Sequence, residues 1–149
     1  MPKLYIMVGI PGSGKSTYAE KNLSQFATIF SSDKLRGELL GDENDQSNKD
    51  LIFRTLYDRV RGYLLEGKNA VIDATNLNKA ERSRVLENFK DIDNVERVAV
   101  FVNTPLDECL LRNSRRARVV PESVIRDFHS RLEKPSIDEG FSSIIEVKR

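Results

Sequence analysis

The sequence contains few of the residues from which disulfide frameworks and reactive-thiol sites are built. Its 149 residues include one cysteine, one histidine and no tryptophan. A single cysteine excludes an internal disulfide; Cys109 falls in an apolar stretch and is predicted to be a small core residue, with a reactive thiol as the alternative. The only histidine, His129, falls within an expected helix, where we predict a surface or packing role and not that of a catalytic base.

Long apolar runs and a strong net charge are also absent. No stretch approaches the roughly 18 apolar residues that a membrane span requires. The first eight residues lead directly into a glycine-rich loop, so they are interpreted as a strand and not as a signal peptide. With 24 Lys and Arg against 23 Asp and Glu, the net charge is +1, which gives no global attraction to nucleic acid or membrane but leaves a local basic groove open. We therefore expect a cytoplasmic protein without an obligate protein partner.

The residues that are present are those of an ordinary globular domain. Hydrophobic residues make up 39% of the chain and charged residues 32%. The length suits one hydrophobic core, and we find neither repeats nor an internal linker, so residues 1–149 are expected to form a single domain.

The segment Gly9-Ile10-Pro11-Gly12-Ser13-Gly14-Lys15-Ser16 fits the pattern G-x-x-x-x-G-K-[ST]. Glycines let such a loop turn tightly, so that successive N–H groups point at an anion. The lysine can reach the β- and γ-phosphates of a nucleotide, and the Ser16 hydroxyl can bind Mg²⁺. We predict an ATP and Mg²⁺ site; a glycine-rich turn without a ligand is the alternative. The predicted nucleotide contacts are Gly12, Ser13, Gly14, Lys15, Ser16 and Thr17.

Strand and helix patterns alternate along the chain. Strands are expected at 4–8, 28–32, 70–73, 98–102 and 144–147, and helices at 15–25, 33–40, 49–66, 78–90, from 105 and 121–132. The helix at 49–66 is indicated by the helical spacing of Ile52, Leu56, Val60 and Tyr63 or Leu64. Gly41 is expected to end the helix before it, Asn78 with Glu81 to cap the next one, and Pro105 and Pro121 to stand at the first positions of the last two helices. Repeated β-α units indicate an α/β fold with a mostly parallel sheet of four or five strands covered by helices. Ligands bind at the carboxyl ends of the strands in such sheets, so functional residues are expected where strands end.

Charged residues follow the second expected strand. If a helix begins near Asp33, then Asp33 and Arg36 share one face. A carboxylate beside a triphosphate can accept a proton from an attacking hydroxyl, and an arginine on the same face can hold an anionic acceptor. The alternative is that Asp33 only caps the helix and that Arg36 is a solvated charge.

The third expected strand ends in Asp73, followed by Ala74, Thr75 and Asn76. An acid at this position can orient the waters of a metal ion or a neighbouring loop. The alternative is that Asp73 and Asn76 are turn formers.

A cluster of arginines, Arg112, Arg115, Arg116 and Arg118, lies between two expected helices. Arginine can stabilise a transferring phosphoryl group, and a basic lid over residues 112–120 would also exclude water. A nucleic-acid-facing patch and a solvated basic turn are the other interpretations of the same residues.

Taken together, these pieces resemble the kinase domain of polynucleotide 5′-hydroxyl kinases of the bacteriophage type. The resemblance extends from the phosphate loop to about Leu132, most of the chain. Its pieces are the loop through Thr17, Asp33-x-x-Arg36, Thr75-Asn76-Leu77-Asn78, Arg112-Asn113-Ser114-x-Arg116 and Val120-Pro121. It implies a P-loop kinase-like three-layer sandwich with an arginine-rich lid.

The resemblance also implies roles for individual residues. Asp33 would be the general base on the 5′-hydroxyl, Arg36 would hold the phosphate of the acceptor, and Arg116 would contact the donor phosphates. One departure concerns the acid that the family carries directly before Thr-Asn: here that position is Ala74, and the acid is Asp73. Adjacent strand residues point to opposite faces, so this role is not carried over automatically.

The resulting hypothesis is an ATP-dependent, Mg²⁺-requiring phosphotransferase that acts on the 5′-hydroxyl end of DNA or RNA. Its catalytic residues would be Lys15, Asp33 and Arg116, with Arg112 and Arg115 beside the donor. The acceptor would be contacted by Asp33, Arg36, Asp73, Thr75 and Asn76. A kinase of a small alcohol, such as a sugar or nucleoside, is one alternative, and a nucleotide-dependent switch or binding module is another.

Overall fold

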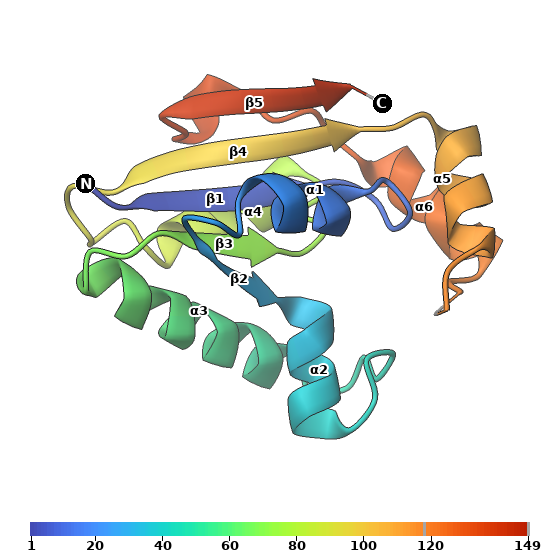
Figure 1. Cartoon of the computed structure of the whole chain (residues 1–149), viewed down its shortest axis with the longest axis horizontal. Helices are drawn as coiled ribbons and strands as arrows, with labels where there is room; N and C mark the ends of the chain where they lie inside the picture. The colour runs from blue at the N-terminus through green and yellow to red at the C-terminus, as the bar shows by residue number, and fades with distance from the viewer. Residues whose placement is uncertain (118, 149) are drawn as a thin grey trace.

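Five strands form one sheet in the order β2-β3-β1-β4-β5, and all four pairings between neighbours are parallel. This computed structural model describes residues 1–117 and 119–148. The strand arrowheads in Figure 1 all point to the edge of the sheet at which α2 and α5 begin. The strands are β1 (Lys3–Val8), β2 (Thr28–Ser31), β3 (Ala70–Asp73), β4 (Glu96–Asn103) and β5 (Ser143–Lys148).

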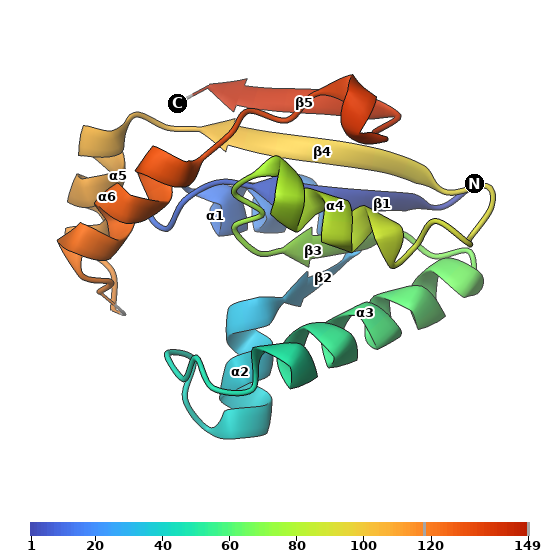
Figure 2. The same ribbon diagram turned by 180° about the vertical axis from the view of Figure 1, so that it is seen from behind.

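Helices cover both faces of the sheet. One face carries α1, and the opposite face carries α3 and α4, as the two views in Figures 1 and 2 show. The prediction of a three-layer α/β fold is confirmed. No helix within residues 1–117 and 119–148 has the length and apolarity to cross a membrane. The helices are α1 (Lys15–Asn22), α2 (Ser32–Leu40), α3 (Lys49–Leu65), α4 (Lys79–Glu87), α5 (Leu106–Ser114), α6 (Glu122–Arg131) and the short 3₁₀ helix η1 (Ile137–Glu139).

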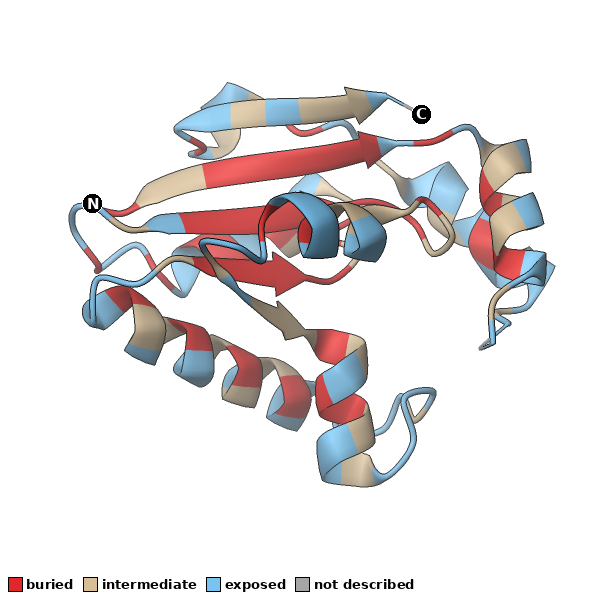
Figure 3. Ribbon diagram, in the orientation of Figure 1, coloured by how far each residue is buried: buried red, intermediate tan, exposed pale blue. Residues whose placement is uncertain are grey.

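The central strand β1 is buried on both faces. Leu4 and Ile6 point toward α3 and α4, whereas Tyr5 and Met7 point toward α1, because successive side chains of a strand alternate between faces. All four are at most 5% exposed. Figure 3 shows the same pattern for the whole sheet, with burial concentrated in the inner strands. The strand that leads into the phosphate loop is therefore held from both sides.

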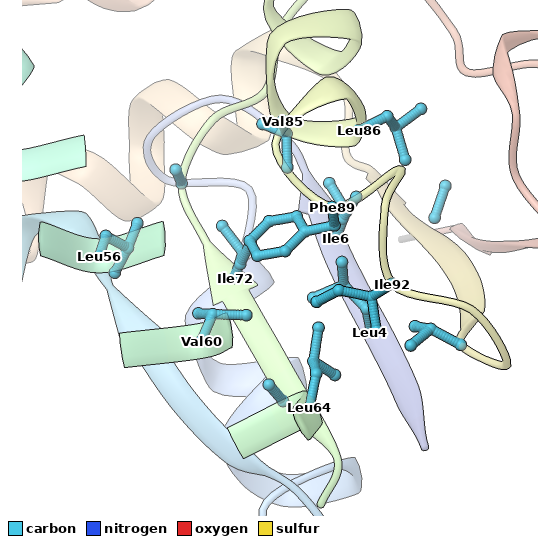
Figure 4. Close-up of a cluster of buried hydrophobic side chains, with 14 of the residues drawn as sticks. Leu4, Ile6, Leu56, Val60, Leu64, Ile72, Val85, Leu86, Phe89 and Ile92 are labelled. Atoms are coloured by element: carbon cyan, nitrogen blue, oxygen red, sulfur yellow. The ribbon is translucent and has the colours of Figure 1, made fainter. Parts of the chain in front are cut away.

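The larger core cluster joins α3 and α4 to the sheet (Figure 4). The predicted helical spacing of Ile52, Leu56, Val60 and Leu64 is confirmed, since all four are buried in α3. Phe89, which follows α4, is 0% exposed and packs in the same cluster. Burial of one such side chain contributes about 1.5–3 kcal/mol to folding.

The start of α2 differs from the expectation. Ser31, and not Asp33, caps this helix, because the Ser31 hydroxyl accepts a hydrogen bond of 3.2 Å from the Lys34 N–H. Asp33 therefore lies inside the first turn, and the interpretation of it as merely a cap is wrong. The predicted stop at Gly41 is confirmed, since Gly41 adopts the left-handed conformation with φ of 79°.

The two prolines expected in the first turns of helices lie just outside them. Pro105 and Pro121 have ψ of 147° and 140°, which are extended values, and they stand at the N-cap positions of α5 and α6. The predicted cap at Asn78 is confirmed: its side chain accepts a hydrogen bond of 2.9 Å from the Glu81 N–H. Helix α1 ends at Asn22, three residues before the expected end at Gln25.

Candidate active site

The phosphate loop connects β1 to α1 at the carboxyl edge of the sheet (Figure 1). Gly12 and Gly14 have φ of 84° and 90°, in the left-handed region that glycine adopts without strain. A Cβ atom on Gly12 would lie 2.5 Å from the carbonyl oxygen of Cys109 in α5, so the loop passes directly against that helix. Because Gly14 is the N-cap of α1, the loop brings any bound anion to a helix N-terminus.

Lys15, Ser16 and Asp73 converge below this loop. The Ser16 hydroxyl donates a 2.7 Å hydrogen bond to Asp73 Oδ2. The ammonium group of Lys15 lies 3.9 Å from Asp73 Oδ1. Since Asp73 is the last residue of β3 and is 6% exposed, this carboxylate is a fixed anionic group inside the site. The interpretation of Asp73 as merely a turn former is thereby excluded.

The oxygen atoms that converge at this point are suitable ligands for Mg²⁺. Asp73 Oδ1 is buried and has no hydrogen-bond donor among the described residues. A carboxylate oxygen and a hydroxyl oxygen, completed by water and phosphate oxygens, are ligands that Mg²⁺ accepts in nucleotide sites. The Ser16 hydroxyl and Asp73 would hold the hydrated ion beside the phosphates, where it would neutralise their charge.

Neighbouring segments fix the ends of the phosphate loop. The Thr104 hydroxyl, directly after β4, donates a 2.6 Å hydrogen bond to the Ser13 carbonyl. The Gly9 N–H donates a 3.1 Å hydrogen bond to the Thr75 carbonyl, after β3. The loop is therefore attached to both strands that flank β1.

Asp33 and Arg36 lie in the first turns of α2, directly after β2. Strand register pairs Ser31 with Asp73, which places the first turn of α2 next to the end of β3. Arg36 Nη1 donates a 2.7 Å hydrogen bond to Asp33 Oδ1, as the spacing of three residues predicted. The guanidinium also lies 5.9 Å from the ring centre of Phe53 in α3. Arg36 is 9% exposed in its side chain and Asp33 is 40%, so the carboxylate is the accessible member of the pair.

Thr75 and Asn76 are placed differently from one another. Thr75 is half-buried after β3, whereas Asn76 is 5% exposed. The Asn76 side-chain amide donates a 2.7 Å hydrogen bond to the Met7 carbonyl of β1. Contact with an acceptor therefore stays a prediction for both residues, and Asn76 has an inward-facing role besides.

The arginine cluster lies where α5 ends, beyond the carboxyl edge of the sheet (Figure 2). Arg112 pairs with Glu108 one turn earlier in α5, at 2.8 Å. Arg115 is exposed and Arg116 half-buried, in the segment between α5 and α6. Arg118 lies outside the described residues. Arg112 thus lies inside α5, and only Arg115 and Arg116 of the described arginines lie between the two helices. That this segment forms a lid, and that its arginines contact the phosphate donor, stay predictions.

Asn113 closes the base of this lid. The side-chain NH₂ group of Asn113 donates a 2.6 Å hydrogen bond to the Val120 carbonyl, and the side-chain Oδ1 accepts a 3.0 Å hydrogen bond from the Val120 N–H. In the sequence Asn113 stands out only as part of the arginine motif, with no role of its own. A signal is nevertheless there, because an Asn directly before Ser-Arg-Arg at a helix end is well suited to bind backbone groups.

Cys109 lies behind the phosphate loop and is 0% exposed. Burial raises the pKa of its thiol to about 11, so the thiolate form is disfavoured. The prediction of a core cysteine is confirmed. His129 is exposed on α6, which confirms the predicted surface position.

Comparisons with known proteins identify a family and relatives of this chain. A family model described as an AAA domain matches residues 4–135. The L-seryl-tRNA(Sec) kinase of Methanococcus maripaludis is 26% identical to the chain over 151 residues. That alignment covers 89% of this chain and 53% of that protein, so the chain spans about half the length of this curated relative.

Two solved structures resemble the fold closely. A chain of the Pnkp1/Rnl/Hen1 RNA repair complex superposes with a TM-score of 0.76 at 24% identity, covering 88% of this chain and 44% of that one. An unliganded sugar kinase from Janibacter sp. HTCC2649 superposes with a TM-score of 0.73 at 18% identity, covering 99% of this chain and 86% of that one. At these identities the likeness concerns the fold.

Proposed function

The chain belongs to the AAA domain family and has the α/β fold of P-loop kinases, and from this premise we propose that it moves the γ-phosphate of ATP to the 5′-hydroxyl end of a nucleic acid. The observation that carries the proposal is the convergence of Lys15, Ser16 and Asp73, with Asp33 at the adjacent strand end. The first three residues suit a Mg²⁺-bound triphosphate. Asp33 is an accessible carboxylate at the start of α2, next to the end of β3.

The donor half of the reaction rests on the phosphate loop. Backbone N–H groups of residues 12–14 would hold the phosphate oxygens, and Lys15 would reach the β- and γ-phosphates. Ser16 and Asp73 would hold Mg²⁺. Thr17, in the first turn of α1, would contact the donor as well. These interactions would hold the γ-phosphate at the carboxyl edge of the sheet, the edge at which β2 also ends.

The acceptor half rests on Asp33 and Arg36. The Asp33 carboxylate would accept the proton of the attacking hydroxyl. Arg36, which donates a 2.7 Å hydrogen bond to that carboxylate, would hold the phosphate of the acceptor. Arg116, with Arg112 and Arg115, would stabilise the negative charge on the transferring group. Transfer breaks the bond between the γ-phosphorus and the β–γ bridging oxygen and forms a bond from the acceptor oxygen, leaving ADP.

Two relatives support a nucleic acid as the acceptor. The curated relative is named for a seryl-tRNA, and one structural neighbour is part of an RNA repair complex. Resemblance to polynucleotide kinases of the bacteriophage type points to the same class. Since this chain spans only part of both proteins, the acceptor is part of the proposal.

The test is transfer of labelled γ-phosphate from ATP with Mg²⁺ to a 5′-hydroxyl oligonucleotide, with the 5′-phosphorylated form as the control acceptor. We expect label on the 5′-hydroxyl oligonucleotide alone, no transfer after EDTA, and a loss of at least about 100-fold in Asp33→Asn. The exposed Asp93, at the far end of the sheet, provides a matched control in Asp93→Asn. Near wild-type transfer by Asp33→Asn would remove the general-base role.

A small alcohol is the second candidate acceptor, favoured by the sugar kinase neighbour and by the net charge of +1. Salt separates the two candidates, because binding to a phosphate backbone releases counterions and weakens steeply with salt. A KM for the acceptor that is insensitive to salt between about 50 and 200 mM, together with transfer to a sugar or nucleoside, would favour the small alcohol.

A further inference from the structure

A second group of buried polar residues lies behind the phosphate loop, and no step of the proposed transfer uses it. Arg82 of α4 is 0% exposed and Asn76 is 5% exposed. A guanidinium buried this deeply is unfavourable unless acceptors surround it. The partners of Arg82 therefore indicate why the fold retains it.

Arg82 joins α4 to η1, which is distant in sequence, and to the segment directly after β3. Its Nε and Nη2 donate hydrogen bonds to the two carboxylate oxygens of Glu139 in η1, at 2.8 and 3.2 Å. Its Nη1 donates a 2.9 Å hydrogen bond to the Asn76 carbonyl, after β3. Burial raises the pKa of Glu139, but the hydrogen bonds from Arg82 and from the Ser136 N–H outweigh it and hold the pKa below its ordinary value. The pair is thus charged at neutral pH.

The carbonyl that Arg82 binds belongs to a strained residue. Asn76 has φ of 46°, in the left-handed region that residues with a side chain seldom adopt. From this position its side-chain amide reaches the Met7 carbonyl at 2.7 Å. The preceding carbonyl, that of Thr75, accepts the hydrogen bond from the Gly9 N–H at 3.1 Å. Two adjacent residues thus hold both sides of the junction at which β1 becomes the phosphate loop.

We propose that Arg82 is a positioning residue for nucleotide binding: by fixing the left-handed peptide at Asn76, it sets the place from which the phosphate loop begins. Without the Nη1 hydrogen bond, the buried Asn76 carbonyl lacks a partner, and the segment after β3 rearranges. Gly9 and Met7 then lose their partners together. A displacement of about 1 Å in a binding group reduces activity by as much as about 100-fold, although Arg82 itself contacts no ligand.

The alternative explanation is that Arg82 only stabilises the fold, and the experiment must separate this role from that of positioning the phosphate loop. The double variant Arg82→Met with Glu139→Gln removes both buried charges together, and such replacements are often neutral for stability. The side chain of glutamine keeps an acceptor for the Ser136 N–H, which Glu139 binds at 2.8 Å. The variant therefore removes the hydrogen bond to Asn76 without leaving a buried charge unpaired.

Arg97 provides the matched control. Its guanidinium also binds main-chain carbonyls, those of Val95, Phe89 and Ile92, at 3.0, 2.6 and 3.1 Å. These carbonyls lie in the turn before β4, at the amino end of the sheet, far from the phosphate loop. Arg97→Met removes an arginine anchor of the same kind and has no route to Gly9.

The experiment measures three quantities for each variant: the Kd for Mg²⁺-ATP by calorimetry, the Tm, and hydrogen exchange of the Gly9 amide by NMR. We expect the double variant to keep a Tm close to wild type, with a Kd raised about tenfold or more and faster exchange at Gly9. Arg97→Met should lower Tm without changing the other two. Wild-type Kd and Gly9 exchange in the double variant would overturn the proposal.

A second variant and a separate test of the proposed function keep the result decisive. If the double variant does not fold, Arg82→Lys, which retains the charge beside Glu139 but cannot bind both partners, undergoes the same measurements with the same expectations. The inference rests on the proposed function only for the identity of the ligand. A wild-type protein that binds Mg²⁺-ATP but phosphorylates no acceptor would overturn the proposed function alone, and Gly9 exchange would still decide the role of Arg82.

Discussion

Gly12 shows how strictly single residues of the phosphate loop are constrained. Its φ of 84° disfavours any residue with a side chain, and a Cβ would lie 2.5 Å from the Cys109 carbonyl, which belongs to the backbone of α5 and has little freedom to move. Either the loop or α5 must shift to accept alanine. The loop and α5 both lie at the predicted ATP site.

We expect Gly12→Ala to lower the free energy of unfolding by about 1–3 kcal/mol, through the unfavourable φ and the overpacked contact. Nucleotide affinity should fall by about tenfold or more, because the displaced N–H groups no longer converge on the phosphates. Urea unfolding and calorimetric titration with Mg²⁺-ATP measure the two effects. An unchanged Kd would show that the loop tolerates a side chain here.

Gly62 is the matched control at the same scale. It lies in the last turn of α3, and a Cβ atom added to it would meet no other atom within 4 Å outside its own helix backbone and chain neighbours. Gly62→Ala should raise the free energy of unfolding by about 0.5–1 kcal/mol, because alanine loses less backbone entropy in a helix. Nucleotide affinity should stay the same.

Among the elements, the segment between α5 and α6 depends on one side chain at its base. Asn113 binds both the N–H and the carbonyl of Val120, and it is 4% exposed. This pair of hydrogen bonds closes the loop that carries Arg115 and Arg116. The two ends of this segment are thus joined by a residue that carries no charge.

We expect Asn113→Ala to accelerate tryptic cleavage after Arg115 or Arg116 by roughly tenfold, since two part-buried backbone groups lose partners worth about 1–3 kcal/mol. Peptide mass mapping during limited proteolysis measures the rate. Asn88→Ala is the control, because the Asn88 side-chain amide donates a hydrogen bond to the Arg84 carbonyl at an exposed position, away from this segment. Equal acceleration in both variants would contradict a specific role at the lid.

The elements could be predicted to the extent that their signals are local. The strand, loop and helix order at residues 3–22, the cap at Asn78, the stop at Gly41 and the apolar face of α3 each depend on residues close together in sequence, and these four features are confirmed. The pairing of Arg82 with Glu139 joins residues 57 apart in sequence. No local pattern distinguishes that arginine from its solvated neighbours, so its burial could not be foreseen.

The site illustrates the same limit. Asp73 stands out in the sequence because it ends an apolar run, but its hydrogen bond to Ser16 depends on the parallel register of β1 and β3, which the sequence does not state. The inward turn of Asn76 likewise follows from a positive φ that is fixed by contacts elsewhere in the fold.

For the molecule as a whole, the buried pair of Arg82 and Glu139 links stability to pH. Because the folded pKa of Glu139 lies below its ordinary value of 4.5, its contribution is fully present above that value and is lost as the pH falls through the folded pKa. Protonation would also leave Arg82 buried without its counter-charge.

We expect the free-energy difference between wild type and the Arg82→Met, Glu139→Gln variant to be constant above about pH 5.5 and to shift against the wild type at lower pH. Urea unfolding at about pH 7, 5 and 3.5 measures it, and the other carboxylates cancel because both proteins share them. Arg97→Met should show no such pH-dependent difference. Parallel curves down to about pH 3.5 would mean that Glu139 has the same pKa in the folded and the unfolded protein, and would contradict the prediction.

The central position of β1 has a consequence for biosynthesis. This strand pairs with β3 through Leu4 and Ala70 and with β4 through Lys3 and Glu96, so a ribosome that has released only the first third of the chain has released neither partner. Until β3 emerges, this apolar strand has no neighbouring strand to pair with, and its second edge stays unpaired until β4 has followed. Strand β1 is thus synthesised first but is among the last strands to pair on both edges. The nascent chain is most prone to aggregation while residues 4–8 are unpaired.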